Sequence, residues 1–266
     1  MTVRRGYVGA PGRQVHYRAG GSEGPVVVLL HESPQASNVF EPALVTLGRS
    51  MRAYALDTPG YGLSDPPGAP REIPGYAELL LSAIDDLGID TFTVVGQHTG
   101  ASLAVEVARQ AGSRRVSHVV LSGIALLTAQ ERAEFLDHWA PDIASAEDGS
   151  HLRNLWERYV RLWEGPPELL TLSVTNIASV LPRYNWAYNA AFRYDPGPAL
   201  AQLDAQLLLL TARRDMLAHL DERALALRPD ALQLTLTQTT GQLPWREPDR
   251  FAGIVADFVA GRLAPR

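Results

Sequence analysis

Short apolar runs, rich in β-branched residues, alternate along the chain with longer stretches of mixed polarity. Six runs predict buried strands, at residues 26–31, 52–57, 92–96, 116–122, 207–211 and 232–237. Upstream, Tyr7–Val8 and Gln14–Tyr17 flank a Pro-Gly turn and predict an antiparallel hairpin at the sheet edge. Strands that alternate with helical stretches favour an α/β fold, with a mostly parallel eight-stranded sheet flanked by helices.

The strand pattern disappears between residues 124 and 203, a segment that holds four of the five Trp residues. Proline residues divide it into short helical pieces. Ligands of open α/β sheets bind beyond the carboxyl ends of the strands. We therefore expect residues 1–123 and 204–266 to form one core and residues 124–203 to form a helical lid or cap over that edge. A last helix is expected from about Asp249 to Gly261.

Composition narrows the classes of function. The chain has 266 residues, 46% of them hydrophobic, with 24 scattered Lys and Arg and a net charge of −5, so nucleic acid is not an expected partner. No apolar run approaches the ~18 residues of a membrane span, and no leader pattern precedes the first strand, so we expect a cytoplasmic protein without a membrane partner. Cysteine is absent, which excludes thiolate metal sites and cysteine nucleophiles. We expect a small-molecule substrate, no cofactor and no metal, and homodimerisation stays open.

The strongest local signal is Gly96-Gln97-His98-Thr99-Gly100, which joins a predicted strand to a predicted helix. Small residues on both sides of a central residue permit the strained turn called a nucleophile elbow, which pushes the central side chain into the active site. Here the central residue is His98, where a serine is usual.

Together with this turn, three further stretches resemble the α/β-hydrolase fold family over nearly the whole chain. His31-Glu32-Ser33-Pro34 is similar to the family's oxyanion loop, and residues 57–65 are similar to its Asp-x-x-Gly-x-Gly-x-Ser-Asp stretch. Asp215 stands at the family's acid position. The resemblance implies an oxyanion hole at Glu32 and Thr99. Residues 98–101 and 148–152 also resemble an atypical subgroup with His in place of the elbow serine, G-x-H-T-G-A.

Two positions depart from the family pattern. His98 replaces the serine, and Gln242 follows Thr240-Gly241 where the family has its general base. Glutamine has no titratable proton, so a serine triad of the usual kind is absent. We predict that His98 is a general base, which Asp215 orients directly or through Gln242 while backbone amides of the oxyanion loop and elbow hold the resulting anion.

Each of these residues also has a structural interpretation. His98 is alternatively a degenerate elbow in a binding protein, Asp215 a helix cap, and Gln242 a hydrogen-bonding spacer. For Glu32 we favour a side chain turned to solvent over a second acid or base in the site.

Candidate substrate-binding residues come from the strand ends and the lid. They are His31, Gln97, His151, Trp186, Tyr188 and Trp245. Other aromatic residues of the lid, Trp139, Trp156, Trp163 and Tyr184, either line an aromatic pocket or pack the lid onto the core. His16, His118 and His219 do not belong to a motif with other candidate catalytic residues, so they are interpreted as structural.

The sequence thus predicts a cofactor-independent enzyme acting on a small carbonyl-containing organic substrate, with His98 as general base in lyase or cyclase chemistry. The first alternative is a hydrolase in which His98 activates water on an ester, a thioester or a C–C bond. The second is a ligand-binding pseudo-hydrolase without turnover.

Overall fold

The computed structural model describes residues 2–236 and 240–263, and its centre is an eight-stranded sheet in the order β1-β2-β4-β3-β5-β6-β7-β8. The strands are β1 (Arg4–Ala10), β2 (Arg13–Gly20), β3 (Val26–Leu30), β4 (Arg52–Leu56), β5 (Thr93–Gln97), β6 (His118–Ser122), β7 (Gln206–Ala212) and β8 (Leu232–Leu236). β2 pairs antiparallel with β1 and β4, and the pairs from β4 to β8 are parallel. The predicted hairpin and strands are confirmed, except that residue 237 of the last one lies outside the described residues.

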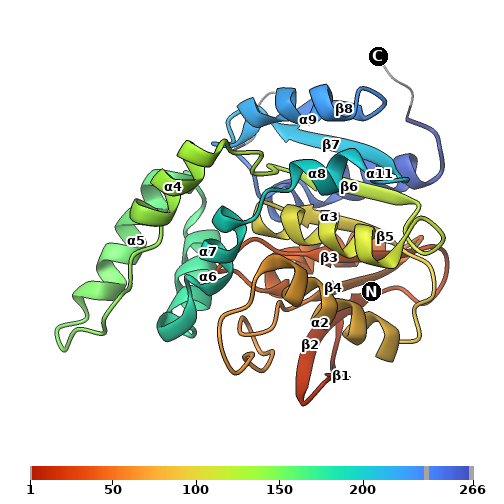
Figure 1. Ribbon diagram of the computed structural model, residues 1–266. Helices are drawn as coiled ribbons and strands as arrows, with labels where there is room; N and C mark the ends of the chain where they lie inside the picture. The colour runs from red at the N-terminus through yellow and green to blue at the C-terminus, as the bar shows by residue number, and fades with distance from the viewer. Residues whose placement is uncertain (1, 237–239, 264–266) are drawn as a thin grey trace.

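Helices cover both faces of this sheet (Figure 1). They are α1 (Glu41–Leu47), α2 (Ile73–Asp86), α3 (Thr99–Ala111), α4 (Ala129–His138), α5 (Ser150–Trp163), α6 (Pro167–Ala178), α7 (Trp186–Arg193), α8 (Gly197–Ala201), α9 (Asp221–Leu227), α10 (Leu243–Arg246) and α11 (Pro248–Val259). One core packs α2 and α3 against the sheet, and a second packs α1 and α11 against the opposite face. The helix predicted at residues 249–261 is α11.

Apolar periodicity explains why α2 covers the sheet. Its residues Ile73, Tyr76, Ala77, Leu80 and Ile84 are buried and recur at three- and four-residue spacing, which places them on one face of a helix. Pro74 stands in the first turn, where its missing N–H costs nothing. β3, in contrast, is apolar and buried at all five positions because it lies inside the sheet with a layer on each face.

The segment between β6 and β7 is helical, and Figure 1 shows α4 and α5 extending away from the sheet while α6 and α7 lie against the core. Tyr61 attaches this segment to the core, because its hydroxyl donates to the carbonyl of Tyr184 at 3.1 Å and accepts from the N–H of Ala187 at 2.8 Å. Nδ2 of Asn176 adds a second attachment by donating to Oε1 of Gln35 at 2.9 Å.

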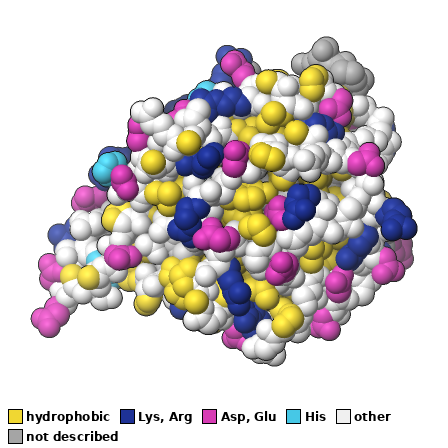
Figure 2. All heavy atoms as spheres, viewed as in Figure 1, with side chains coloured by type: hydrophobic (Ala, Val, Ile, Leu, Met, Phe, Trp, Pro, Cys, Tyr) yellow, Lys and Arg dark blue, Asp and Glu magenta, His cyan; other side chains and the backbone are white. Residues whose placement is uncertain are grey.

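Charged side chains of both signs are interspersed over the face shown in Figure 2. Within the described residues, no helix is both long enough and apolar enough to span a membrane.

Candidate active site

His98 occupies a sharp strand-to-helix turn between β5 and α3. Its backbone angles are φ 48° and ψ −113°, a conformation that costs a residue with a Cβ on the order of 1–3 kcal/mol. The flanking glycines permit the turn. A Cβ at Gly96 would lie 2.1 Å from the carbonyl oxygen of Gly100, and a Cβ at Gly100 would lie 2.1 Å from that of Leu30. The small residues of the predicted elbow are therefore required by close backbone packing.

The imidazole of His98 is held by Asp215, which follows β7. Nε2 of His98 lies 2.8 Å from Oδ2 of Asp215, and the side chains are 12% and 3% exposed. The other carboxylate oxygen of Asp215 accepts from the N–H of Leu217 at 2.9 Å. Asp215 therefore orients His98 directly and also caps the turn that follows it. Within the described residues, Nδ1 of His98 makes no hydrogen bond.

Electrostatics make this contact an ion pair. Burial lowers the pKa of His98, but the charge and hydrogen bond of Asp215 outweigh burial and raise that pKa to about 9. Burial raises the pKa of Asp215, while the His98 cation lowers it below its ordinary value. The imidazole is consequently protonated at neutral pH, whereas a resting general base would be neutral.

Two residues confine the His98 ring. Trp163, at the end of α5, stacks on it with 5.6 Å between ring centroids and 25° between planes. Gly123, with φ 68°, lies so close that a Cβ there would be 2.7 Å from Nε2 of His98. The ring therefore fits between an aromatic plane and a position without a side chain.

Glu32 corrects the sequence interpretation, because its side chain is turned inward and is 3% exposed. Nε2 of Gln242 donates to Oε1 of Glu32 at 2.8 Å. Burial raises the pKa of Glu32, against a smaller lowering by His98. Gln242 has the role of a hydrogen-bonding spacer, although to Glu32 and not between Asp215 and His98. It is itself held in a left-handed conformation at φ 53°.

The two residues expected to supply an oxyanion hole, Glu32 and Thr99, follow neighbouring strands of the sheet. Thr99 is buried and is the first residue of α3, so its N–H has no acceptor within the helix. The loop of Glu32 follows β3, the strand next to β5 in the sheet. Thr99 directly follows His98 in the chain, so its N–H lies at a helix start, a place that favours negative charge. The oxyanion hole at Glu32 and Thr99 stays a prediction.

A small aromatic cavity opens beside His98. Its volume is about 40 Å³, enough for a few water molecules. The lining includes the predicted Tyr188 and two of the lid aromatics, Trp139 and Trp163, together with Phe135 and Phe192. Phe135 and Phe192 were missed, because their place depends on how α4 packs against α7.

His31 does not meet the expectation of a substrate contact in this structure. Its ring is 1% exposed, its Nδ1–H donates to the carbonyl of Glu32 at 2.8 Å, and its Nε2 accepts from the N–H of Thr58 at 2.9 Å. Burial lowers the pKa of His31, which fits this neutral tautomer. The residue fixes the loop that carries Glu32.

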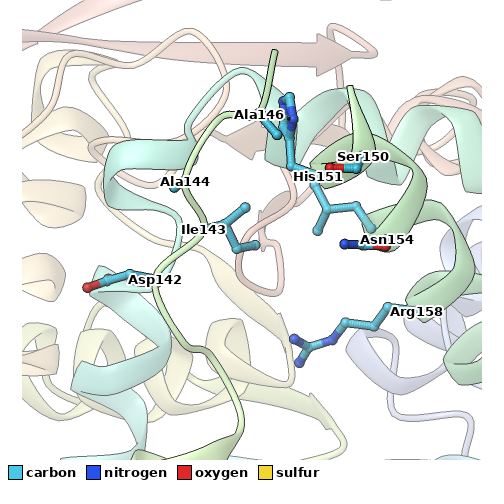
Figure 3. A pocket seen from close by; sticks show the side chains of 9 residues that line it. Asp142, Ile143, Ala144, Ala146, Ser150, His151, Asn154 and Arg158 are labelled. Carbon is cyan, nitrogen blue, oxygen red and sulfur yellow. Dashed lines mark hydrogen bonds between the residues drawn. The ribbon is translucent and has the colours of Figure 1, made fainter. Parts of the chain in front are cut away.

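His151 lies away from His98. It is the second residue of α5, and Trp163 is the last, so the twelve-residue separation along the helix spans about 18 Å. Figure 3 shows His151 with Asn154 and Arg158 in a separate lid pocket of about 350 Å³. Its Nδ1 accepts from the N–H of Ala146 at 3.0 Å. The prediction that His151 reaches the substrate beside His98 is thus not met by this arrangement.

The other predicted contacts are not among the residues that line the aromatic cavity. Gln97 is buried at the end of β5, and its amide nitrogen has no partner among the described residues. Trp186 begins α7 and Trp245 lies in α10, and both are partly exposed. These three remain predictions.

Asp57, the first residue of the 57–65 stretch, stabilises the fold. It accepts from Nδ1 of His16 at 2.8 Å and from the N–H of Leu63 at 2.9 Å. Burial raises the pKa of Asp57, but these bonds and neighbouring charges lower it to about 2. No group of three or more His, Asp or Glu side chains suited to a metal ion occurs in the part of the chain that the structure describes.

The chain belongs to the alpha/beta hydrolase fold family, whose sequence profile matches residues 25–222. Haloalkane dehalogenase 2 of Mycobacterium tuberculosis is 33% identical over 109 residues, which are 41% of this chain and 37% of the dehalogenase. The 2-(acetamidomethylene)succinate hydrolase of Mesorhizobium japonicum is 33% identical over 85 residues, 32% of this chain and 31% of that enzyme. The chain therefore matches about a third of the length of these relatives.

Solved structures agree on the fold. The enol-lactonase of Burkholderia xenovorans superposes with a TM-score of 0.79 over 96% of this chain and 100% of its own, at 19% identity. The structure of an E-2-(acetamidomethylene)succinate hydrolase gives a TM-score of 0.81 over 97% of this chain and 100% of its own, at 19% identity. At these identities the likeness establishes the architecture.

Proposed function

We propose that this protein is a cofactor-independent enzyme that carries out lyase or cyclase chemistry by proton transfer on a small, largely apolar compound with a carbonyl group. The observation that carries the proposal is the 2.8 Å contact between Nε2 of His98 and Asp215, which leaves Nδ1 as the nitrogen without a partner among the described residues. A carboxylate that holds one imidazole nitrogen orients the other for proton transfer.

The charge state of His98 defines the order of events. Because Asp215 raises the pKa of His98 to about 9, the imidazole is mostly protonated at pH 7. His98 therefore begins the reaction as a proton donor to the carbonyl oxygen and becomes a base after that proton has left. This order revises the expectation of a base at rest, and it retains His98 as the central acid–base residue.

The same site argues against the covalent route of the serine enzymes in this fold. The central position of the elbow has no hydroxyl, and Gln242 cannot act as the general base that would activate one. An acyl group on His98 would also lack a second imidazole to release it. The replacement of serine by His98 supports placing the chain in an atypical, non-serine subgroup of the family.

The aromatic wall supports the apolar part of the substrate. Phe135, Trp139, Trp163 and Phe192 surround the face of the cavity next to His98. Aromatic rings bind planar apolar groups by stacking and burial. The charged residue in this wall is the His98 cation. A cation at this place is suited to a carbonyl oxygen that gains negative charge.

Direct hydrolysis is a second candidate, and the named hydrolases among the relatives favour it. In this reaction His98 and the oxyanion amides would assist the attack of water on a carbonyl carbon. The adjoining ester, thioester or C–C bond would then break without a covalent intermediate. Hydrolysis introduces solvent oxygen into the product, whereas elimination and cyclisation do not.

The test is a mass-resolved turnover screen in oxygen-18 water with wild type, His98→Gln and the control His138→Gln, whose histidine is exposed on α4. The probes are enol lactones, β-dicarbonyls, thioesters and aryl esters. Conversion by wild type and the control but not by His98→Gln, without label, is the expected result. Labelled product would establish hydrolysis. Failure of wild type on the whole panel, or equal turnover by His98→Gln, would overturn the proposed function and favour the ligand-binding alternative.

A further inference from the structure

Glu32 and His98 stand at equivalent places on neighbouring strands. Leu30 of β3 pairs with Gly96 of β5. Glu32 follows Leu30 by two positions, and His98 follows Gly96 by two positions. Parallel strands lie about 4.8 Å apart, so the two side chains start from adjacent points at the carboxyl edge of the sheet. Both are inside the protein, with Glu32 3% exposed.

One oxygen of the Glu32 carboxyl lacks a partner. Oε1 accepts from Nε2 of Gln242 at 2.8 Å. Oε2 of Glu32 and Oε1 of Gln242 are buried, and neither has a hydrogen bond among the described residues. Two buried acceptors without donors cost free energy in the resting protein. A donor group that entered the site would complete this arrangement.

We infer that Glu32 is a second catalytic residue, the proton acceptor that works opposite the proton donor His98 on a substrate with an acidic C–H or O–H beside its carbonyl group. This inference rests on the proposed function and names the chemical class of its substrate. Gln242 is a positioning residue, because it holds Oε1 and leaves Oε2 free for the substrate.

The proton-transfer step balances without any further reactant. Oε2 of Glu32 takes the substrate proton, and the electron pair of the broken C–H bond becomes the C=C bond of an enol. The carbonyl oxygen takes the proton of Nδ1 of His98 as its own π bond opens. Glu32 and His98 both end neutral, and Asp215 keeps its charge and its hydrogen bond to Nε2. The enol then expels a leaving group or attacks an electrophilic carbon.

Burial favours this exchange. Charged forms are disfavoured in a low-dielectric site, and the step converts a cation and an anion into two neutral groups. The charged or titratable neighbours that act on Glu32 are His98, Asp215 and Arg246, and Glu32 acts in turn on Tyr159 and Tyr188. Burial raises the pKa of Glu32, so it is a stronger base than an exposed carboxylate.

The test compares Glu32→Gln and Glu32→Asp with wild type on the probe panel above, across pH 4 to 10. Glutamine preserves the size and an acceptor for Gln242 but cannot take a proton. We expect a loss of kcat of about 10²- to 10⁴-fold in Glu32→Gln and disappearance of the acidic limb of the pH profile. Glu32→Asp should keep that limb at a lower rate. Glu78→Gln, on the exposed face of α2, is the matched control and should behave as wild type.

A second readout does not depend on turnover. Nitrogen NMR of the His98 ring should give a lower pKa in Glu32→Gln than in wild type, because the Glu32 charge contributes to the raised value. Full activity in Glu32→Gln while His98→Gln is inactive would overturn the role of Glu32 and leave the proposed function intact. An unchanged His98 pKa would overturn the pairing itself. Inactivity of wild type on every probe would instead overturn the proposed function.

Discussion

Gly123 leaves room for the ring of His98: a Cβ at residue 123 would lie 2.4 Å from Cδ2 of His98. Gly123→Ala should therefore displace the imidazole from Asp215 and also strain a backbone position at φ 68°. We expect a stability loss of about 1–3 kcal/mol and loss of most activity, measured by denaturant unfolding and turnover.

Gly253 provides the opposite control for that substitution. It lies on the exposed side of α11, with no atom within 4 Å of the position that a Cβ would take. Gly253→Ala should raise stability by up to about 1 kcal/mol. Equal effects of the two substitutions would contradict the close fit at Gly123.

The His98–Asp215 pair should make stability depend on pH. The folded-state pKa of His98 is raised from 6.5 to about 9, so its contribution is fully present below pH 6.5 and is lost as pH rises through about 9. The shift corresponds to a contribution on the order of 3 kcal/mol. The pKa of Asp215 is lowered. Asp215 therefore stabilises the folded protein at pH values above its ordinary pKa, and this stabilisation is lost in acid.

The measurement is urea unfolding of wild type and His98→Gln between pH 6 and 10. The free-energy difference between the two proteins should shrink across this range. A difference that stays constant with pH would show that His98 is not protonated in the folded protein.

Serine at the elbow should not restore an esterase by itself. In His98→Ser the hydroxyl would stand in the turn, but Gln242 cannot take its proton. The double variant His98→Ser with Gln242→His places an imidazole beside Asp215, because a Cβ at the adjacent Gly241 would lie only 2.6 Å from Oδ2 of Asp215. We expect a burst of 4-nitrophenol from 4-nitrophenyl acetate in the double variant and none in His98→Ser. A burst in the single variant would mean that another residue acts as the base.

Trp163 should affect substrate binding more than the chemical step. It covers one face of the His98 ring and lines the cavity, so Trp163→Ala removes apolar area that an apolar substrate would contact. We expect KM to rise about tenfold, which corresponds to about 1.4 kcal/mol, with a smaller change in kcat. Leu152→Ala, at an exposed position of the same helix, should leave both constants unchanged. A large fall in kcat alone would instead assign Trp163 to the reaction.

The sequence predicted the strands because their apolar runs match the sheet spacing, and it predicted the elbow because Gly96 and Gly100 stand on either side of His98. Local pattern was sufficient for both features. The acid position of Asp215 followed from the resemblance to the α/β-hydrolase fold family, and the structure places the loops after β5 and β7 at the same edge of the sheet. The direct contact with His98 was one of two arrangements left open by the sequence.

Side-chain directions that depend on distant partners were not predictable. Glu32 turns inward to Gln242, which is 210 residues away in the chain, and no local pattern records that contact. His31 was expected at a substrate because of its motif, but Thr58 and the Glu32 carbonyl use both of its nitrogens. His151 was predicted to contact the substrate because of its motif alone. Its actual position depends on the direction in which α5 leaves the core.

The narrow cavity beside His98 has a consequence for the lifetime of whatever the proposed reaction forms in it. A cavity of about 40 Å³ with aromatic walls has room for few solvent molecules, and Trp163 lies across the His98 ring. A reactive enol released into bulk water would return to its keto form or decompose. Held here, the enol of the proposed reaction would be shielded from solvent, so the time for which the segment with Trp163 stays in place would select which product leaves the protein.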